Sequence, residues 1–284
     1  MKRKIIDHLF RAITALCALV AASVLAVIIG AIWRKGASAM SWEFFTVQMK
    51  EAGVSGGILY HIAGTAILIL TAFLACAPVA ISIGLVHGVY LKREHTRRAV
   101  MLVLYILNGV PAILFGIFGM MVFVQYLGWG KSWLSGGLLL ALMLLPTVTV
   151  AIVARIEGIP RGQIEAAAGL GLRQSQIVHA IYLPRSFGGL ITGSLVGLAR
   201  VAGETAPIMF TATIFAGATL PTGIKESPVL SLPYHIFILA QDSFDPAAGS
   251  KLWGTALTLL LLVFAFSIIA LIPRLKSAVA QHHD

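Results

Sequence analysis

The sequence predicts an all-α membrane protein, a polytopic bundle of about six transmembrane helices. Of its 284 residues, 58% are hydrophobic and only 11% are charged, whereas a soluble domain carries roughly 45–50% apolar and about 25% charged residues. Long uncharged runs recur along the chain, and a spanning helix needs about 20 such residues. A backbone inside hydrocarbon must satisfy its own polar groups, so these runs are expected to be helical.

The uncharged runs, with His counted as neutral, define the expected elements. The first run, 12–33, is longer than the apolar core of a signal peptide, about 7–15 residues, and we expect it to be retained as an N-terminal helix. The later runs, which place the core helices at about 58–273, are 52–91, 99–130, 132–154, 186–224 and 252–273. The run 52–91 is too long for one helix, so part of it is expected to be loop. We therefore expect residues 1–284 to form a single transmembrane domain.

The basic residues indicate the orientation of the chain. The formal net charge is +10, with 21 Lys and Arg against 11 Asp and Glu. Six crossings place 14 of these cations on the side of the N-terminus and six on the other side, with Arg200 inside a run. Positive charges between apolar runs are typical of cytoplasmic loops, so both termini are expected in the cytoplasm and no nucleic-acid partner is expected. Cys17 and Cys76 lie in apolar runs and indicate neither a disulfide nor a metal site.

Residues 156–184 form the longest of the predicted cytoplasmic loops. Alanines beside Glu165 favour a helix, and Gly169 and Gly171 favour a turn. A second helix is expected to begin near Arg173 and to end at Pro184. On the residues alone, this segment is either an ordinary amphipathic connector or a helical hairpin that offers its small residues to a partner.

The spacing of this loop resembles the coupling-loop motif of ABC importer permeases. The motif consists of Glu-Ala-Ala, three residues, Gly, nine residues and Ile-x-Leu-Pro. This chain matches it at Glu165-Ala166-Ala167, Gly171, Ile181, Leu183 and Pro184. In that family the loop docks into a groove on the ATPase subunit. The resemblance implies the type I ABC importer permease fold, and it implies an ATPase contact through Glu165, Ala166, Ala167, Gly171, Leu183 and Pro184.

The chain is not expected to hydrolyse ATP itself. Gly130-Lys131-Ser132 matches the end of a phosphate-binding P-loop, but the first glycine of that motif would stand at position 125, which is Gln125. We interpret the tripeptide as an ordinary loop. ATP and Mg are therefore expected on a separate ATPase subunit, with no cofactor, catalytic residue or metal on this chain.

Arg200 and Glu204 interrupt the run 186–224. Arg200 lies 14 residues into it, which is about 21 Å at 1.5 Å per residue, and an arginine at that depth costs roughly 2.5–3.5 kcal/mol. Residues four apart share a helix face, so one interpretation is a neutralising pair that holds helices together. The other is an anion site, because a guanidinium matches phosphate oxygens and Glu204 can accept a hydrogen bond from the proton that hydrogen phosphate carries and sulfate lacks.

Smaller polar signals accompany this pair. Pro111 is expected to kink the run 99–130, and a carbonyl freed beside Asn108 could line a path, although proline kinks are common in membrane helices. Thr147 and Thr149 follow Pro146, where helix packing is the more frequent role.

The stretch 199–207, continued by 210–212, resembles PstA-type permeases of the Pst phosphate importer. Gly56-Gly57-Ile58 and Asn108-Gly109-Val110-Pro111 agree with that family, so the resemblance covers about residues 53–215. Ala112 departs from it, because Ser is common after the proline. The resemblance implies roles for Arg200 and Glu204, and we expect the substrate path to include Arg200, Glu204, Thr205 and Asn108.

The function implied by this resemblance is that of a non-catalytic permease subunit in a bacterial inner membrane, forming half of the pathway for inorganic phosphate. The implied partners are a homologous second permease (PstC-like), a dimeric ATPase (PstB-like), a periplasmic phosphate-binding protein (PstS-like) and the lipid bilayer. Another oxyanion, such as sulfate or molybdate, is the nearest alternative substrate. A proton-coupled anion carrier with Glu204 as relay and an intramembrane enzyme acting through Ser55 are the other classes.

Overall fold

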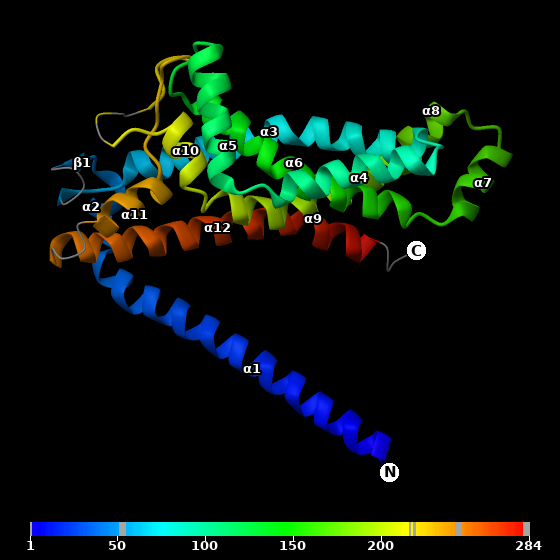
Figure 1. Ribbon diagram of the computed structural model, residues 1–284, viewed down its shortest axis with the longest axis horizontal. Helices are drawn as coiled ribbons and strands as arrows, with labels where there is room; N and C mark the ends of the chain where they lie inside the picture. The colour runs from blue at the N-terminus through cyan, green and yellow to red at the C-terminus, as the bar shows by residue number, and fades with distance from the viewer. Residues whose placement is uncertain (1, 51–54, 216, 218–219, 242–245, 281–284) are drawn as a thin grey trace.

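The computed structural model describes residues 2–50, 55–215, 217, 220–241 and 246–280 as an elongated helical bundle (Figure 1). The helices are α1 (Lys2–Gly36), α2 (Trp42–Thr46), α3 (Leu59–Leu85), α4 (Glu94–Gly109), α5 (Ala112–Gly119), α6 (Trp133–Glu157), α7 (Arg161–Gly169), α8 (Gln174–Ile177), α9 (Leu183–Val201), α10 (Ala206–Thr211), α11 (Leu232–Gln241) and α12 (Pro246–Ala280). Shorter turns are the 3₁₀ turn η1 (Ala37–Ala39) and the π-helical turns η3 (Val86–Tyr90), η4 (Met120–Tyr126) and η5 (Val178–Tyr182). Strands β1 (Met49–Lys50) and β2 (Ser55–Gly56) pair antiparallel, with Met49 opposite Gly56.

The core lies where α3, α6 and α9 pack together. Its centre is α6, whose Leu139, Leu144, Val148 and Ile152 are at most 1% exposed. A helix apolar on all sides is buried in a bundle or in a membrane, and α6 is enclosed by neighbouring helices here. The α6 helix is therefore the fixed element against which the polar residues of other helices are positioned.

A stripe of glycines brings α9 against α6. A Cβ added at Gly193 would lie 2.7 Å from the Cα of Val148, and one at Gly189 would lie 2.5 Å from the Cα of Ile152. These glycines are four residues apart and face α6 together, which is the small-residue spacing that lets membrane helices approach closely. The register of α9, and hence the position of Arg200 at its end, is fixed by this packing.

Several helices are long and apolar enough to cross a membrane. Four qualify as single spans, Ile6–Ala39, Leu59–Tyr90, Trp133–Glu157 and Ala248–Ile269, and a fifth is the bent pair Glu94–Gly109 with Ala112–Tyr126. The 19-residue α9, which contains Arg185 and Arg200, is less apolar. It completes six helices of 16 residues or more in the described part of the chain.

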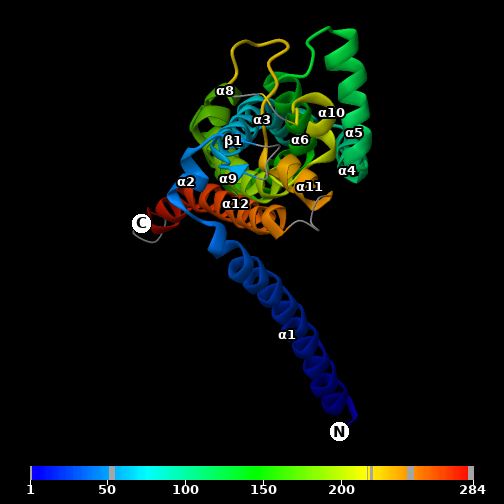
Figure 2. The same cartoon turned by 90° about the vertical axis from the view of Figure 1, so that its left-hand side faces the viewer.

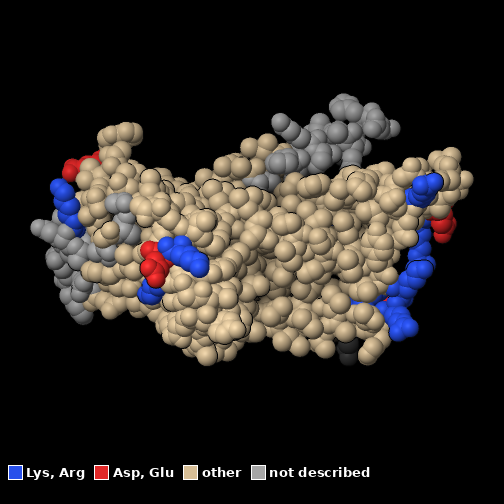
Figure 3. Space-filling model, turned by 90° about the horizontal axis from the view of Figure 1, so that it is seen from above, with Lys and Arg blue, Asp and Glu red and all other residues tan. Residues whose placement is uncertain are grey.

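The first and last helices begin and end on the same side of the molecule. The start of α1 and the end of α12 are on the same side as α7 and α8 (Figure 1), which we call the α7 end; β1, α2 and α11 mark the opposite, β1 end. Charged side chains on one face gather towards these two ends, with a broad uncharged region between them (Figure 3). This distribution suits a bundle whose middle is surrounded by lipid.

Helix α1 leaves the bundle and points away from it (Figure 2). Its contacts are with η1 and α12, where a Cβ at Gly36 would lie 2.6 Å from the carbonyl oxygen of Trp253. Lys35 lies over the Trp253 ring at 4.5 Å. The predicted helix 12–33 is present within α1, and most of its length is open to lipid or to another subunit.

The run 99–130 was expected to form one kinked helix, but it is broken into two. The axes of the α4 and α5–η4 segments differ by 93°. Val110 is extended with ψ 131° and Pro111 follows it, because the proline ring excludes the helical conformation at the residue before it. The bend is far larger than an ordinary proline kink.

The run 186–224 was expected to be helical, but its helix stops early. Helix α9 ends at Val201, α10 covers six residues, and Thr213 then forms a bridge with Val229. Gly203 and Pro207 interrupt the helix because neither residue supports its interior. His235, expected in a loop, lies in α11 and its ring is 4.1 Å from that of His61. The expected start of the run 52–91 falls at 51–54, outside the described residues.

Candidate anion site between α4, α6 and α9

Two helices break at the same place near the middle of the bundle. Helix α4 ends at Gly109 before the extended Val110, and α9 ends at Val201 before α10 begins. The short helices that follow, α5 and α10, pack against each other, and a Cβ at Gly116 would lie 2.8 Å from the Phe210 ring. This contact holds the two breaks together.

Arg200 and Asn108 meet at these breaks. The Arg200 Nη1 donates a hydrogen bond of 2.9 Å to the Asn108 Oδ1, although the residues are 92 apart in sequence. The Thr147 Oγ1 of α6 donates to the same oxygen at 3.4 Å. The amide nitrogen of Asn108 makes no hydrogen bond within the described residues. The Asn108 Oδ1 therefore orients the guanidinium, and the other N–H groups of Arg200 and the amide N–H groups of Asn108 remain available to a ligand.

Arg200 and Glu204 form a loose ion pair. The Arg200 Nε lies 3.7 Å from the Glu204 Oε1, which is too long for a hydrogen bond. The arginine stands in the last turn of α9, where the helix dipole favours a cation. Glu204 follows the helix, and its backbone N–H donates to the Val201 carbonyl at 3.1 Å. Both sequence interpretations, pairing and anion binding, are compatible with this contact.

The site is open on the surface of this chain. The Arg200 side chain is 46% exposed and that of Glu204 is 17% exposed. Thr147 is ten residues from the end of α6 at Glu157, which is about 15 Å along the helix and close to its middle. An arginine at that level must face protein or water, and the exposed side of Arg200 is open to either.

Thr205, also expected in the path, stands next to Glu204 at the start of α10. It is half-buried, and its carbonyl accepts the Met209 N–H at 3.0 Å, but its side chain does not cap the helix. Among the described residues its hydroxyl makes no hydrogen bond to Arg200 or Asn108. The position of Thr205 agrees with a path role, and its contacts do not assign it one.

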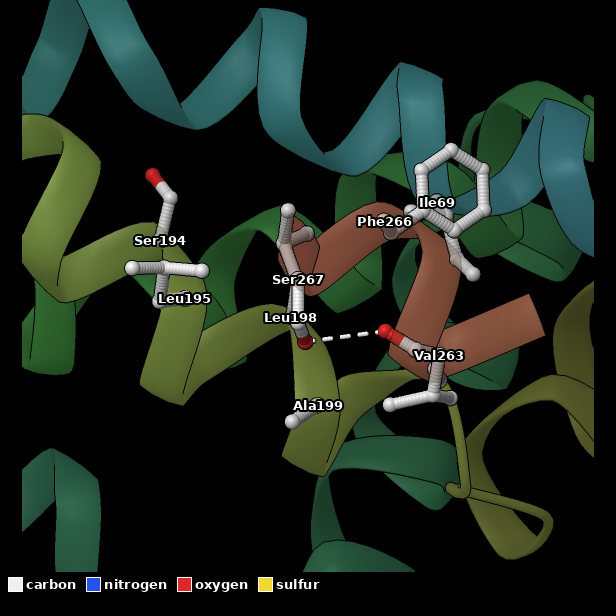
Figure 4. Close-up of a pocket in the computed structure, with 9 residues that line it drawn as sticks. Ile69, Ser194, Leu195, Leu198, Ala199, Val263, Phe266 and Ser267 are labelled. Carbon is white, nitrogen blue, oxygen red and sulfur yellow. Dashed lines mark hydrogen bonds between the residues drawn. The ribbon is translucent and has the colours of Figure 1, made fainter. Parts of the chain in front are cut away.

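The face of α9 behind Arg200 holds a small apolar cavity. Ser194, Leu198 and Ala199 line it with Ile69 of α3 and Val263, Phe266 and Ser267 of α12 (Figure 4). Its volume is about 10 Å³, room for about one water molecule. The Ser267 hydroxyl donates to the Val263 carbonyl at 2.8 Å. A tetrahedral oxyanion does not fit there, so the surface at Arg200 and Asn108 is the candidate site.

The predicted helical hairpin is present at the α7 end. Glu165 and Ala166 are exposed on α7, whereas Ala167 is 6% exposed. Gly171 has φ +82° with nothing within 4 Å of its Cβ position, so glycine is needed there for its backbone conformation. Helix α7 lies at the far end of the molecule (Figure 1), and the exposed Glu165 and Ala166 are accessible to a partner there.

Pro184 was expected to end the second helix of the hairpin, but it lies at the start of α9. The π-helical turn η5 leads into Leu183 without a break. The preceding π-helical turn accommodates the proline, which has no N–H to donate to the turn before it. Leu183 and Pro184 therefore join the hairpin to the helix that carries Arg200.

The two other motifs are accounted for by local structure. The Lys131 ammonium donates to the Met209 carbonyl at 2.9 Å and Ser132 caps α6, so Gly130-Lys131-Ser132 is a structural loop. Ser55 lies in the short strand β2, which is not the strand-to-helix turn that a serine nucleophile of the G-x-S-x-G pattern requires. Gly53 and Val54 of that pattern lie outside the described residues.

Comparison with known proteins identifies the family. Residues 78–279 match the family described as binding-protein-dependent transport system inner membrane component. The chain is 26% identical over 281 residues to the probable ABC transporter permease protein YqgI of Bacillus subtilis, covering 95% of both chains. It is 32% identical over 273 residues to the phosphate transport system permease protein PstA 2 of Mycobacterium bovis, covering 94% of this chain and 87% of the relative.

The fold agrees with a solved transporter. A chain of the methionine ABC transporter MetNI, in an inward-facing conformation, superposes with a TM-score of 0.55 and 17% identity, covering 75% of this chain and 93% of that one. The predicted all-α type I importer fold is therefore confirmed. With the match over residues 78–279, this chain belongs to the binding-protein-dependent transport system inner membrane components, the permease subunits of ABC importers.

Proposed function

We propose that this chain is a PstA-type permease that forms half of the pathway for inorganic phosphate. The observation that carries the proposal is the guanidinium of Arg200, held at 2.9 Å by Asn108 and 46% exposed where α4 and α9 both break. Relatives from Mycobacterium bovis and Xylella fastidiosa, 32% and 30% identical, are named as phosphate transport permeases and support this substrate.

The chemistry of the site suits hydrogen phosphate. The guanidinium is charged at every working pH and offers several N–H donors in a plane, and the Asn108 amide adds two more. A doubly charged oxyanion meets these donors with short, charge-assisted hydrogen bonds. The Glu204 carboxylate, beside the arginine, accepts a hydrogen bond from the P–OH group of hydrogen phosphate, and it repels sulfate, which has no such group to donate.

The remaining parts of the transporter follow from the open faces of the chain. A homologous second permease covers the surface at Arg200 and closes the path. The exposed Glu165 and Ala166 on α7 meet an ATPase dimer, and the β1 end receives the phosphate-binding protein. In this arrangement the α7 end, with both chain termini, is cytoplasmic, and ATP hydrolysis takes place on the separate subunit.

Phosphate uptake by an Arg200→Gln variant tests the proposal. The whole transporter is reconstituted in proteoliposomes, and co-purification of the ATPase reports assembly. We expect normal assembly and uptake below about one hundredth of the wild-type rate, because each lost charge-assisted hydrogen bond contributes roughly 1.5–3 kcal/mol. Arg185→Gln, at the start of the same helix, is the matched control and should transport normally. Normal uptake by the Arg200 variant would remove this arginine from the path.

A second variant, Glu204→Gln, tests the substrate. It should admit sulfate as a competitor of phosphate uptake, while the wild-type transporter rejects it. If both transporters reject sulfate equally well, the Glu204 carboxylate does not distinguish a protonated oxyanion from an unprotonated one. If the wild-type transporter takes up sulfate or molybdate and not phosphate, the phosphate assignment is wrong, and the chain is a permease for another oxyanion.

A further inference from the structure

Helix α4 is joined to α6 by polar contacts at two levels. At mid-bundle the Thr147 hydroxyl of α6 contacts the Asn108 amide oxygen at 3.4 Å. At the α7 end the Arg97 Nη2 donates to the Glu157 Oε1. Between these contacts Leu104 of α4 is 4% exposed and packs into the bundle. A displacement of one end of α4 relative to α6 is thus opposed at the other end.

The two contacts lie on one face of α4. Arg97 and Asn108 are eleven residues apart, which is about three helical turns and about 16 Å. Helix α4 is continuous from Glu94 to Gly109 and contains no proline. An uninterrupted helix of this length moves as a rigid rod, so a shift at Arg97 is carried to Asn108, which holds the Arg200 guanidinium.

Glu157 connects this rod to the predicted coupling helix. It is the last residue of α6, and α7 begins four residues later at Arg161. A hollow of about 420 Å³ lies between them, and Arg97, Glu157, Arg161 and Glu165 all line it. The His87 ring of η3, 3% exposed, is also 3.8 Å from the Glu157 carboxylate. Three segments therefore meet at one carboxylate beside α7.

The Arg97–Glu157 pair is poorly placed to serve as a stability element. Its side chains are 31% and 47% exposed, and exposed ion pairs add little to the stability of a fold. What distinguishes it is the set of elements that it joins. The neighbouring pair of Arg98 and Glu94, 3.0 Å apart, lies within α4 alone and joins nothing to it.

We infer that the Arg97–Glu157 ion pair is a positioning contact that transmits movement of α7 through α4 to Asn108 and the Arg200 guanidinium. The inference rests on the proposed function in that an ATPase moves α7. It predicts that breaking the pair uncouples the site from ATP while leaving the transporter assembled and ATP hydrolysis intact.

A labelled cysteine beside the site tests this directly. Gly109 follows Asn108, and nothing lies within 4 Å of its Cβ position, so Gly109→Cys accepts a maleimide without disturbing the packing. With Cys17 and Cys76 replaced by alanine, the labelling rate of the reconstituted transporter is measured with and without ATP. We expect ATP to change this rate in the wild-type background. No change there would overturn the inference.

The variants Arg97→Gln and Arg98→Gln are then compared in that background. For Arg97→Gln we expect the ATP response to fall at least about fivefold, the lower range of allosteric coupling, with ATP hydrolysis within twofold of the wild type. Arg98→Gln should leave both unchanged. If ATP changes the labelling rate of Arg97→Gln as much as that of the wild type, the inference is refuted. This result does not depend on which anion is transported.

Exchange of the two charges, Arg97→Glu with Glu157→Arg, covers the case in which a single variant fails to assemble. Restoration of the ATP response supports a direct pair, and assembly without a response overturns it. The labelling readout requires no substrate. A transporter that responds to ATP at Gly109→Cys but takes up no phosphate would therefore refute the proposed function alone.

Discussion

Replacing Asn108 by aspartate tests the anion site with the least change in shape. The two side chains have nearly the same size, and the oxygen that accepts the Arg200 bond at 2.9 Å is retained. The change places a negative charge where the oxyanion is expected to meet the guanidinium. Asn108→Asp should therefore keep the architecture of the site and abolish its attraction for anions.

The size of the effect follows from an assumed separation of about 4 Å between the new carboxylate and the oxyanion, with each counted as at least one unit charge. Two unit charges about 4 Å apart repel each other by about 4 kcal/mol at an effective dielectric constant of about 20, and each 1.4 kcal/mol is about a factor of ten. The expected loss of uptake is therefore about a thousandfold. Because Arg200 is 46% exposed on this chain, water that screens half of the repulsion would reduce the loss to about thirtyfold.

Initial rates of radiolabelled phosphate uptake in proteoliposomes provide the assay, with co-purification of the ATPase as the measure of assembly. Thr147→Val is the control, because it removes only the 3.4 Å contact to the same oxygen. A hydrogen bond that long contributes less than a typical one, about 0.5–1.5 kcal/mol, so we expect at most about a fivefold loss. If assembled Asn108→Asp keeps more than a third of wild-type uptake, the anion does not pass within reach of Asn108.

Three further predictions concern the packing of α9, the α7–α8 hairpin and the charge of Arg200. Gly193→Ala should lower the thermal stability of the purified permease by about 1–3 kcal/mol, because its Cβ would lie 2.7 Å from the α6 backbone, whereas Gly188→Ala has nothing within 4 Å and should not; equal melting temperatures would contradict this packing. Gly171→Ala at φ +82° should cost about 1–2 kcal/mol and weaken ATPase binding in a titration, while Gly169→Ala should bind as the wild type does. Arg200→Leu should raise the melting temperature of the isolated permease, because it removes a charge whose donors this chain satisfies only in part, and a lower melting temperature would contradict this.

The sequence was sufficient to predict the helical bundle, and it singled out residues that lie together at the candidate site, because both give local signals. An uncharged run of about 20 residues predicts a span wherever it occurs, and a single arginine in such a run stands out by its cost. Arg200 and Glu204 were found in this way, whereas Asn108 was singled out by the neighbouring Pro111 and by the family resemblance. The hydrogen bond from Arg200 to Asn108 could not be found, because it joins residues 92 apart and depends on how α4 and α9 pack on α6.

The missed features have the same origin. Pro111 predicts a kink, but the 93° bend also depends on the packing of α5 on α10, which Gly116 permits. Pro184 predicts a helix end, whereas the preceding π-helical turn η5 lets the chain continue into α9. The Arg97–Glu157 pair gave no signal at all, because charged residues at helix ends are common. Predictions from neighbouring residues fail where contacts with a distant segment determine the backbone conformation.

The incomplete state of the Arg200 site is itself informative. Within the described residues this chain gives the guanidinium one hydrogen bond, to Asn108, and one long ion pair, to Glu204. A charge with unmet donors near the middle of a membrane bundle is unfavourable unless water or another subunit reaches it. The donors that destabilise the isolated chain are the ones that an oxyanion needs, so stability and binding oppose each other at this residue. The stability gain expected for Arg200→Leu and the uptake loss expected for Arg200→Gln are therefore two consequences of one arrangement. A permease equally stable with leucine at this position would mean that the arginine is already satisfied by its own chain and has nothing left to offer an anion.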